Sequence, residues 1–536
     1  MFSKSLLMSS ILAGLAFGST ATAQIESDSM GDLSAWGQRY LSSEEPEFPI
    51  SLWRNSSDEV LLSLLQSVQT ADLGPAERRL LRRIVLSPAT RPRGELAEAL
   101  LAERARLMLE LGEARAAAAL APQLKQDARG LDAETLAVDL DLASGQEASA
   151  CAELNGEFKQ GDYWLKLRAV CAVLRDNYSG AQLAIEFAER QGVDDEWLIE
   201  AIFAAAGDAP NPPGARFDSG LNIALSSKAT FDTTDVTLAE GRPDLAAAAA
   251  RRPGVPDELR VRLAEIASEL DLITAEDRRD ILFARLGGED YIAASGIEQA
   301  LQDLTDPLVA DEVRSERLAT VLQEASREGL TRYRNTARLF LPDIQDLTQS
   351  PMTATYAMDF AKAAMMAGDR QTALSWLETF SFEGMAQPDP FEAAMLEAVD
   401  VISGGDDSVA SLEAIQERLI GAVDSGARED QAALVLAAWT GLGLPLSPLG
   451  RDFIVQVSDR GDRIAQGQVI GMKAAILSNA IAETGLTVLV TTSGEVGRLA
   501  ASDYAALLET LIALGAEDIA RELAIEASGF WKVPSE

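Results

Sequence analysis

Two cysteines are the residues of this sequence best suited to covalent chemistry. Cys151 and Cys171 are the only two in the chain of 536 residues. In an exported protein, which the N-terminus indicates below, an even cysteine count is typical of a disulfide. A redox pair would instead favour Cys-x-x-Cys at a helix N-terminus. The spacing leaves room for a turn between two helices, so we predict that a structural disulfide joins Cys151 to Cys171 across neighbouring antiparallel helices.

Histidine is absent from the whole chain. A Ser-His-Asp triad, a Cys-His pair and a histidine-based metal site are therefore impossible. No Gly-x4-Gly-Lys-Ser/Thr loop occurs either. The 84 acidic residues make carboxylate pairs unavoidable, so no pair marks a site. We predict that the protein is not an enzyme and has no catalytic residue, no metal site and no cofactor.

Aromatic side chains are the second set of candidates. Tyr163, Trp164, Trp197 and Trp376 could line a groove for a glycan or a peptide. Each of them also lies at helical spacing among leucines and alanines, which favours packing in a core. Both interpretations stay open at this point.

The chain is strongly acidic, with a formal net charge of −38 at pH 7. Such a balance argues against binding nucleic acid or anionic lipid, because both need basic patches. The one basic cluster, Arg78, Arg79, Arg82 and Arg83, lies beside the apolar stripe of a predicted helix. We interpret this cluster as a solvated helix face.

The N-terminus has the pattern of a secretion signal. Lys4 precedes the apolar run Leu6–Phe17, and Ala21-Thr22-Ala23 forms a small-x-small cleavage site. We predict cleavage after Ala23 and export to the periplasm of a Gram-negative bacterium. Gln24 is not a cysteine, so nothing indicates a lipid anchor, and no later stretch predicts a transmembrane span.

The elements that position the cysteines are amphipathic helices joined by short turns. A glycine followed five residues later by an alanine recurs at these turns. Glycine ends a helix in the left-handed conformation, and the small alanine lets the preceding helix lie close. The pattern occurs at Gly112 with Ala117, Gly145 with Ala150, Gly241 with Ala246, Gly368 with Ala373 and Gly515 with Ala520, and with aspartate in place of glycine at Asp176 with Ala181.

The spacing of these turns suggests a repeat. Successive intervals are 33, 31, 65, 127 and 147 residues. The first four lie near one, one, two and four times about 32 to 33, close to the period of tetratricopeptide repeats, whereas the last does not fit. We predict an all-α fold, an irregular α-solenoid of stacked antiparallel helical hairpins. The alternative is a set of irregular hairpins whose matches are partly chance.

Proline- and glycine-rich breaks suggest where the chain divides. A helix is also expected to end at Pro342, a short helix is expected over Asp235–Ala239, and Phe530 and Trp531 are expected to cover the open end of the stack. The predicted parts are a signal peptide (1–23), a loose N-terminal segment (24–55), an N-terminal helical-repeat block (56–206), a linker with short helices (207–256), a central helical-repeat block (257–440) and a C-terminal helical block with a capping tail (441–536).

The sequence resembles a known group over most of its length, most specifically in the two-cysteine stretch. The run Ala150–Leu154, followed by Tyr163-Trp164, Cys171 and Ala181-Gln182-Leu183, is similar to a pattern in uncharacterised exported helical-repeat proteins of alphaproteobacteria. Some of these carry the automatic label "antifreeze glycopeptide polyprotein", which implies no activity. The resemblance implies an exported helical-repeat protein, and the degenerate similarity to tetratricopeptide repeats implies an interaction scaffold.

Together these features predict a non-catalytic periplasmic scaffold or adaptor. It would bind an envelope protein through its helical-repeat surface and would not bind nucleic acid. The alternative is a protein that binds cell-wall glycan, peptidoglycan, or cleaves it with a carboxylate.

Overall fold

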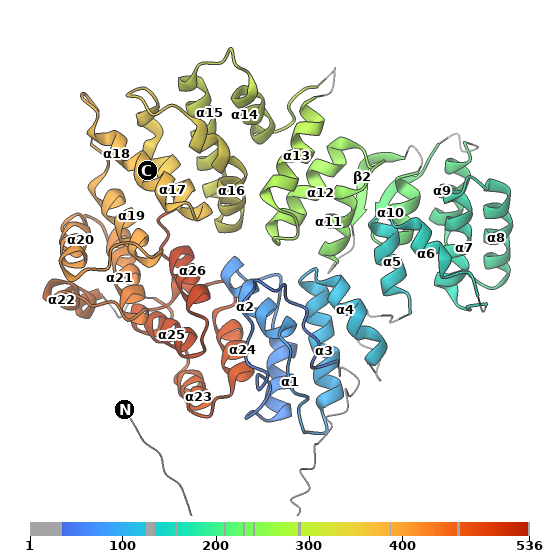
Figure 1. Cartoon of the computed structure of the whole chain (residues 1–536), viewed down its shortest axis with the longest axis horizontal. Coiled ribbons are helices and arrows are strands. Elements are labelled where there is room, and N and C mark those ends of the chain that lie inside the picture. The colour runs from blue at the N-terminus through green and yellow to red at the C-terminus, as the bar shows by residue number, and fades with distance from the viewer. Residues whose placement is uncertain are drawn as a thin grey trace, which may run out of the picture.

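The structure is a computed structural model that describes residues 35–124, 132, 134–156, 158–207, 211–228, 231–238, 242–287, 291–385, 387–457 and 461–533. The predicted signal peptide, its cleavage site after Ala23 and the turn residue Gly241 lie outside these residues. The described chain is built of helices with one small sheet, so the predicted all-α class is confirmed (Figure 1).

The helices follow one another along the chain with short connections. The first are α1 (Asp58–Ser67), α2 (Pro75–Leu86), α3 (Ala97–Glu110), α4 (Ala114–Leu120), η1 (Ala121–Gln123), α5 (Leu136–Ala143), α6 (Glu147–Ala152), α7 (Asp162–Leu174), α8 (Tyr178–Arg190) and α9 (Glu196–Ala205). The middle of the chain contains β1 (Gly214–Phe217), α10 (Gly220–Ser226), β2 (Asp232–Leu238), α11 (Pro243–Arg251), α12 (Asp257–Glu269), α13 (Ala275–Leu286), α14 (Gly296–Thr305), α15 (Asp311–Glu328) and α16 (Leu330–Asp346). The remainder is η2 (Thr353–Tyr356), α17 (Ala357–Ala367), α18 (Arg370–Glu378), η3 (Thr379–Ser381), α19 (Pro390–Ile402), α20 (Val409–Gly421), α21 (Gly426–Gly441), α22 (Pro448–Val457), α23 (Gln466–Leu477), α24 (Ile481–Thr492), η4 (Val496–Arg498), α25 (Ala501–Ala513) and α26 (Glu517–Ala527).

Many helices pair as hairpins through turns of one geometry. Gly112, Gly145, Asp176, Gly368 and Gly515 all have positive φ angles, between 58° and 91°. At each turn the next N–H donates to the carbonyl oxygen five residues before it, over 2.7–2.9 Å, which satisfies a carbonyl at the helix end. The alanines of the pattern are all buried, at Ala117, Ala150, Ala181, Ala246, Ala373 and Ala520.

The same turn recurs where the sequence pattern does not mark it. Gly404, Gly443 and Asn479 have φ angles of 95°, 80° and 54° and make the same hydrogen bond. These turns divide the long interval between Gly368 and Gly515 into steps of 36, 39, 36 and 36 residues. The pattern missed them because the residue five positions later is not alanine but Val409, Pro448 or Thr484.

Two hydrophobic cores hold the molecule together. One joins the N-terminal helices to everything that follows α13, and its buried members range from Ala35 to Leu140 and from Leu282 to Trp531. The other contains Val138 to Ile281, the helices α5 to α13. The second core therefore spans the predicted linker 207–256 instead of ending there.

The two ends of the first core pack against one another. Helix α1 contacts α24, and α2 contacts both α24 and α26 (Figure 1). Trp531 is buried and stacks on Tyr333 of α16, with ring centroids 5.9 Å apart. Phe530 is buried beside it, so these residues fill an internal junction, whereas we expected them to cover an open end. The hairpins therefore form a closed arrangement and not a stack with two free ends.

Three local predictions were wrong. The segment around Asp235 is strand β2, paired in parallel with β1, because its run of β-branched residues favours extended backbone over helix. Helix α16 continues through Pro342 to Asp346, because the fully buried Ile344 packs in the core beyond the proline.

The third concerns the segment predicted to be loose. We expected only Trp36 and Tyr40 to be docked. Trp36 is indeed buried, but Phe48 and Trp53 are buried as well, and the Ala89 N–H donates to the Trp36 carbonyl oxygen over 2.7 Å. Burial against α2 removes the apolar side chains of this segment from water, which stabilises the packed conformation.

Candidate functional site

The predicted disulfide is confirmed. Cys151 on α6 and Cys171 on α7 are bonded, with their Cα atoms 5.8 Å apart. Both side chains are buried in the second core. The bond therefore links the neighbouring helices α6 and α7, and its sulfur atoms are buried away from solvent.

The four candidate groove aromatics lie mostly inside the cores, and of these four only Tyr163 and Trp164 are in contact. Trp164 and Trp197 are buried in the second core, and Trp376 is buried in the first. The Trp197 indole donates to the Gly214 carbonyl oxygen over 2.7 Å. Tyr163 is partly buried and makes an edge contact with Trp164. The structure thus brings these side chains to no common groove.

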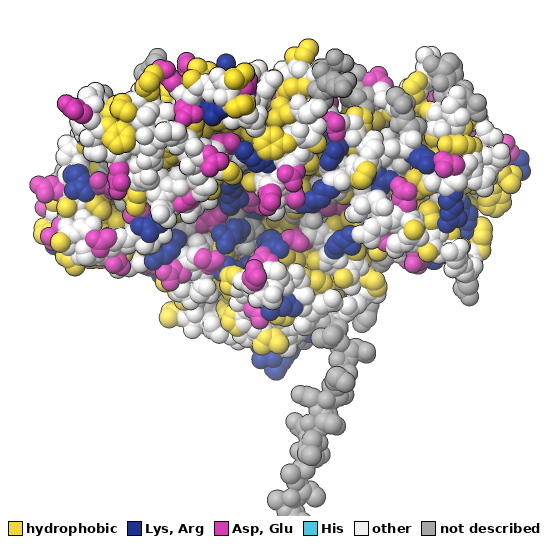
Figure 2. Space-filling model, turned by 45° about the horizontal axis from the view of Figure 1, so that its top comes forward, with side chains coloured by type: hydrophobic (Ala, Val, Ile, Leu, Met, Phe, Trp, Pro, Cys, Tyr) yellow, Lys and Arg dark blue, Asp and Glu magenta, His cyan; other side chains and the backbone are white. Residues whose placement is uncertain are grey.

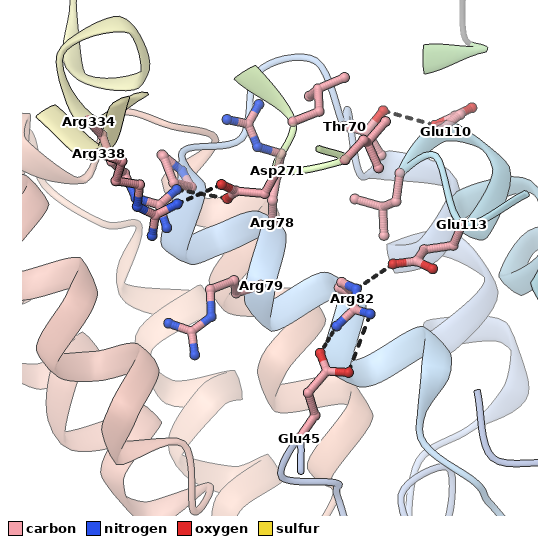
Figure 3. Close-up of a pocket in the computed structure, with 14 residues that line it drawn as sticks. Glu45, Thr70, Arg78, Arg79, Arg82, Glu110, Glu113, Asp271, Arg334 and Arg338 are labelled. Atoms are coloured by element: carbon pink, nitrogen blue, oxygen red, sulfur yellow. Dashed lines mark hydrogen bonds and ion pairs between the residues drawn. The ribbon is translucent and has the colours of Figure 1, made fainter. Parts of the chain in front are cut away.

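A cavity of about 450 Å³ lies between the N-terminal helices and the middle of the chain. We call it the arginine cavity (Figure 3). Its walls come from α2, the α3–α4 turn, the α12–α13 turn and α16, and in the space-filling view basic side chains gather around a hollow near the middle of the molecule (Figure 2). The lining residues are Glu45, Thr70, Pro75, Arg78, Arg79, Arg82, Glu110, Leu111, Glu113, Leu270, Asp271, Leu272, Arg334 and Arg338.

Helical spacing explains why five arginines converge there. Arg78 and Arg82 are four residues apart on α2, and Arg334 and Arg338 are four apart on α16. Residues at this spacing share one helix face. Arg79 adds a guanidinium from the neighbouring face of α2. Two helices about 250 residues apart in sequence thus point basic side chains into one hollow of an acidic protein.

One carboxylate sits among the arginines of α16. Asp271 accepts from Arg334 Nη1 at 2.9 Å and from Arg338 Nη1 at 2.7 Å, one bond to each of its oxygens (Figure 3). It occupies the left-handed position of the α12–α13 turn, with φ of 56°. Its side chain is 41% exposed and that of Arg338 is 36% exposed, whereas Arg334 is only 5% exposed. Solvent in the cavity therefore reaches Asp271 and Arg338 from one side.

The charges of this half of the cavity are unevenly matched. Burial lowers the pKa of Arg78 below its usual value, against the attraction of Asp271, and the repulsion of Arg334 lowers it further. Burial and then Arg334 lower the pKa of Arg338 in the same way. Burial opposes ionisation of Asp271, but Arg334 and Arg338 outweigh it and lower its pKa. Asp271 is thus shared by Arg334 and Arg338. Glu522 of α26 pairs with Arg334 and with Arg79. Arg78 and Arg338 have the smaller share of the negative charge, which favours a further anion beside them.

The opposite half of the cavity is neutralised by local ion pairs. Arg82 donates to Glu45 and Glu113 (Figure 3). The Thr70 hydroxyl donates to Glu110 over 3.1 Å. These groups already have partners, so the half that contains Asp271 is the one suited to an anionic ligand.

Hydrogen-bond donors remain in that half. Arg78 donates through Nη2 to the Glu269 carbonyl oxygen at 3.0 Å, and among the described residues it has no carboxylate within ion-pair distance. Arg338 makes a hydrogen bond through Nη1 alone within the same part of the chain. A guanidinium carries five N–H groups arranged to hold a carboxylate or a phosphate. The cavity therefore combines positive charge, accessible donors and space.

The sequence had indicated only part of this site. It marked Arg78, Arg79 and Arg82, and we expected a solvated face. It offered no sign that Arg334 and Arg338 would join them. Arg83, the fourth member of that cluster, does not face the cavity. Its side chain is 7% exposed and paired with Asp518 of α26, so for this residue the expectation was wrong.

No family model, curated protein or solved structure matches the chain in comparisons with known proteins. Among the described residues, no group of histidine, cysteine, aspartate and glutamate side chains is arranged to hold a metal ion. In the same part of the chain, no helix is both long and apolar enough to cross a membrane.

Proposed function

We propose that this protein is a non-catalytic periplasmic scaffold that holds an acidic segment of an envelope protein in the arginine cavity. The observation that carries the proposal is the convergence of five arginines on a cavity of about 450 Å³ in a chain of net charge −38. The five arginines outnumber the four carboxylates that line the same cavity, whereas in the chain as a whole acidic residues outnumber basic ones. Attraction at one place and repulsion elsewhere define where and how the partner docks.

The wider features of the proposal have their own support. A buried disulfide is typical of an oxidising compartment, which fits export with a signal peptide cleaved after Ala23. Hairpin turns at steps of 36 to 39 residues in the C-terminal part support a distant relation to helical-repeat scaffolds. We also propose that the chain belongs with the alphaproteobacterial group that its two-cysteine stretch resembles.

Site-specific photo-crosslinking in envelope fractions tests the proposal. A photoreactive residue in place of Leu270, which lines the cavity, is compared with one in place of Leu183, which is 67% exposed on α8. We expect the residue at position 270 to crosslink an acidic segment of one envelope protein, identified by mass spectrometry, and an excess of oligoglutamate peptide to abolish the crosslink. Crosslinks that are identical at both positions, or that persist with the competitor, would contradict the proposal.

Sedimentation with purified peptidoglycan tests the alternative. A chain that co-sediments with the glycan or releases muropeptides, and that yields no competitor-sensitive crosslink, would be a cell-wall protein and not an adaptor.

A further inference from the structure

We propose that the arginine cavity is a carboxylate site and that Asp271 is its internal occupant, which an acidic side chain of the ligand must displace from Arg338. This inference deepens the proposed function and rests on it. It identifies the chemical group that is recognised, the residues that contact it and the group that competes with it.

Asp271 shows how a carboxylate fits between the arginines. Its two oxygens accept from two different arginines at 2.9 and 2.7 Å, which is the arrangement of a carboxylate held between two cationic donors. The spacing of Arg334 and Arg338 is thus already matched to a carboxylate. A ligand carboxylate that displaced Asp271 from Arg338 would find an exposed guanidinium there, with Arg78 lining the same cavity.

The two arginines that hold Asp271 differ in exposure and in their other partners. Arg334 is buried, and it also donates to Glu522 of α26 over 2.8 Å, so it is anchored on both sides. Arg338 is 36% exposed, and among the described residues Asp271 is its only hydrogen-bond partner. The Asp271–Arg338 contact is therefore the one that a ligand can reach and exchange, because exposed ion pairs are weak.

Asp271 lies at the boundary between the two cores. It belongs to the turn between α12 and α13, at the edge of the second core, while Arg338 belongs to α16 in the first core. The carboxylate therefore reaches across the boundary between the two cores. A short turn can shift by a side-chain rotation without disturbing either core, so exchange of its carboxylate needs no unfolding.

Calorimetric titration with an oligoglutamate peptide at low salt tests the inference. The variants are Asp271→Asn and Asp271→Gly, because asparagine and glycine both tolerate the left-handed backbone that this position requires. Each removes the internal carboxylate, so we expect the peptide to bind about tenfold more tightly than to the unmodified chain. Two variants keep the test valid if one of them folds poorly.

The chain offers a matched control in Asp176→Asn. Asp176 occupies the same place in the α7–α8 turn, with φ of 58°, and pairs with Lys228 outside the cavity. We expect this variant to bind oligoglutamate like the unmodified chain. Unchanged or weaker binding by both folded Asp271 variants would overturn the inference. So would tighter binding of inorganic phosphate than of oligoglutamate by Asp271→Asn.

The two proposals fail in different ways. If the Asp271 variants bind oligoglutamate no more tightly but the crosslink from position 270 remains competitor-sensitive, the scaffold function stands and the role of Asp271 is refuted. If the Asp271 variants bind oligoglutamate tightly but no partner is crosslinked, the carboxylate site stands without the proposed partner.

Discussion

The Ala76 N–H, in the first turn of α2, donates to the carboxyl group of Glu526 on α26, with distances of 3.1 and 3.3 Å to its two oxygens. These residues are 450 positions apart, so the contact joins the two ends of the chain. The Glu77 carboxyl beside it accepts from the Gly494 N–H over 3.1 Å. The helix that supplies three arginines to the cavity is therefore held in place by the C-terminal helices.

This junction predicts a pH dependence of stability. Burial, followed by the charge of Glu522, raises the pKa of Glu526 from 4.5 to about 8, against the lowering effect of Arg334. Glu77 also raises this pKa, and Arg78 and Tyr504 face the same group. Between about pH 4.5 and pH 8, Glu526 keeps its proton in the folded chain and releases it in the unfolded chain. Rising pH therefore favours unfolding. We expect the free energy of unfolding to fall from about pH 5 to about pH 8 and the contribution of Glu526 to be on the order of 3 kcal/mol.

Urea unfolding of the Glu526→Gln variant at the two pH values measures that contribution. Burial also raises the pKa of Asp139, Asp359 and Glu269, so the unmodified chain contains further contributions of the same sign. The comparison with the variant isolates Glu526. We expect a shallower fall in Glu526→Gln, while the exposed control Glu495→Gln retains the full fall. Equal slopes in all three proteins would refute the assignment.

The turn glycines predict a second effect. Gly112 and Gly515 have nearly the same φ, 79° and 81°. A Cβ atom on Gly515 would meet nothing within 4 Å, but one on Gly112 would lie 2.5 Å from the Leu272 side chain in the cavity wall. We expect Gly515→Ala to cost about 1 kcal/mol for the backbone alone. Gly112→Ala should cost about 1 to 2 kcal/mol more, because Leu272 must move.

Chemical denaturation of both alanine variants checks this difference. Equal losses of unfolding free energy would mean that the α3–α4 and α12–α13 turns do not press on each other, and that this wall of the cavity is looser than the structure shows.

The disulfide predicts a local loss of stability. Replacing Cys151 and Cys171 with serine opens a loop of 20 residues and should lower the free energy of unfolding by about 3 kcal/mol. Since both residues belong to the second core, we expect faster amide hydrogen exchange mainly between Val138 and Ile281. Uniform acceleration that includes α17 and α25 would show instead that the two cores unfold as one unit.

The sequence predicted local features well. The cysteine pair followed from count and spacing, and Gly112, Gly145, Gly368 and Gly515 take the left-handed conformation predicted for them. Helical periodicity and turn glycines are properties of neighbouring residues, and a single sequence shows them directly. Asn479 illustrates the limit of this approach, because it takes the left-handed conformation in place of glycine and leaves no Gly–Ala pattern.

The arginine cavity could not be predicted in the same way. In the sequence, Arg338 looks like any charged residue on an amphipathic helix. It lines the cavity only because α16 packs near α2. That packing depends in turn on the closure between Ala76 and Glu526. Contacts over such separations follow from the complete set of packed helices, not from any local pattern.

The affinity of an oligoglutamate peptide for the cavity tests the central claim most directly. The measurement compares, by calorimetry at low salt, the unmodified chain, the variant Arg78→Gln/Arg338→Gln and the control Arg190→Gln/Arg498→Gln. The control removes the same charge from two exposed arginines outside the cavity, with side chains 74% and 68% exposed. We predict binding at least about tenfold weaker for the cavity variant and nearly unchanged for the control. Equal affinities for the cavity variant and the control would contradict the claim that this cavity recognises acidic partners.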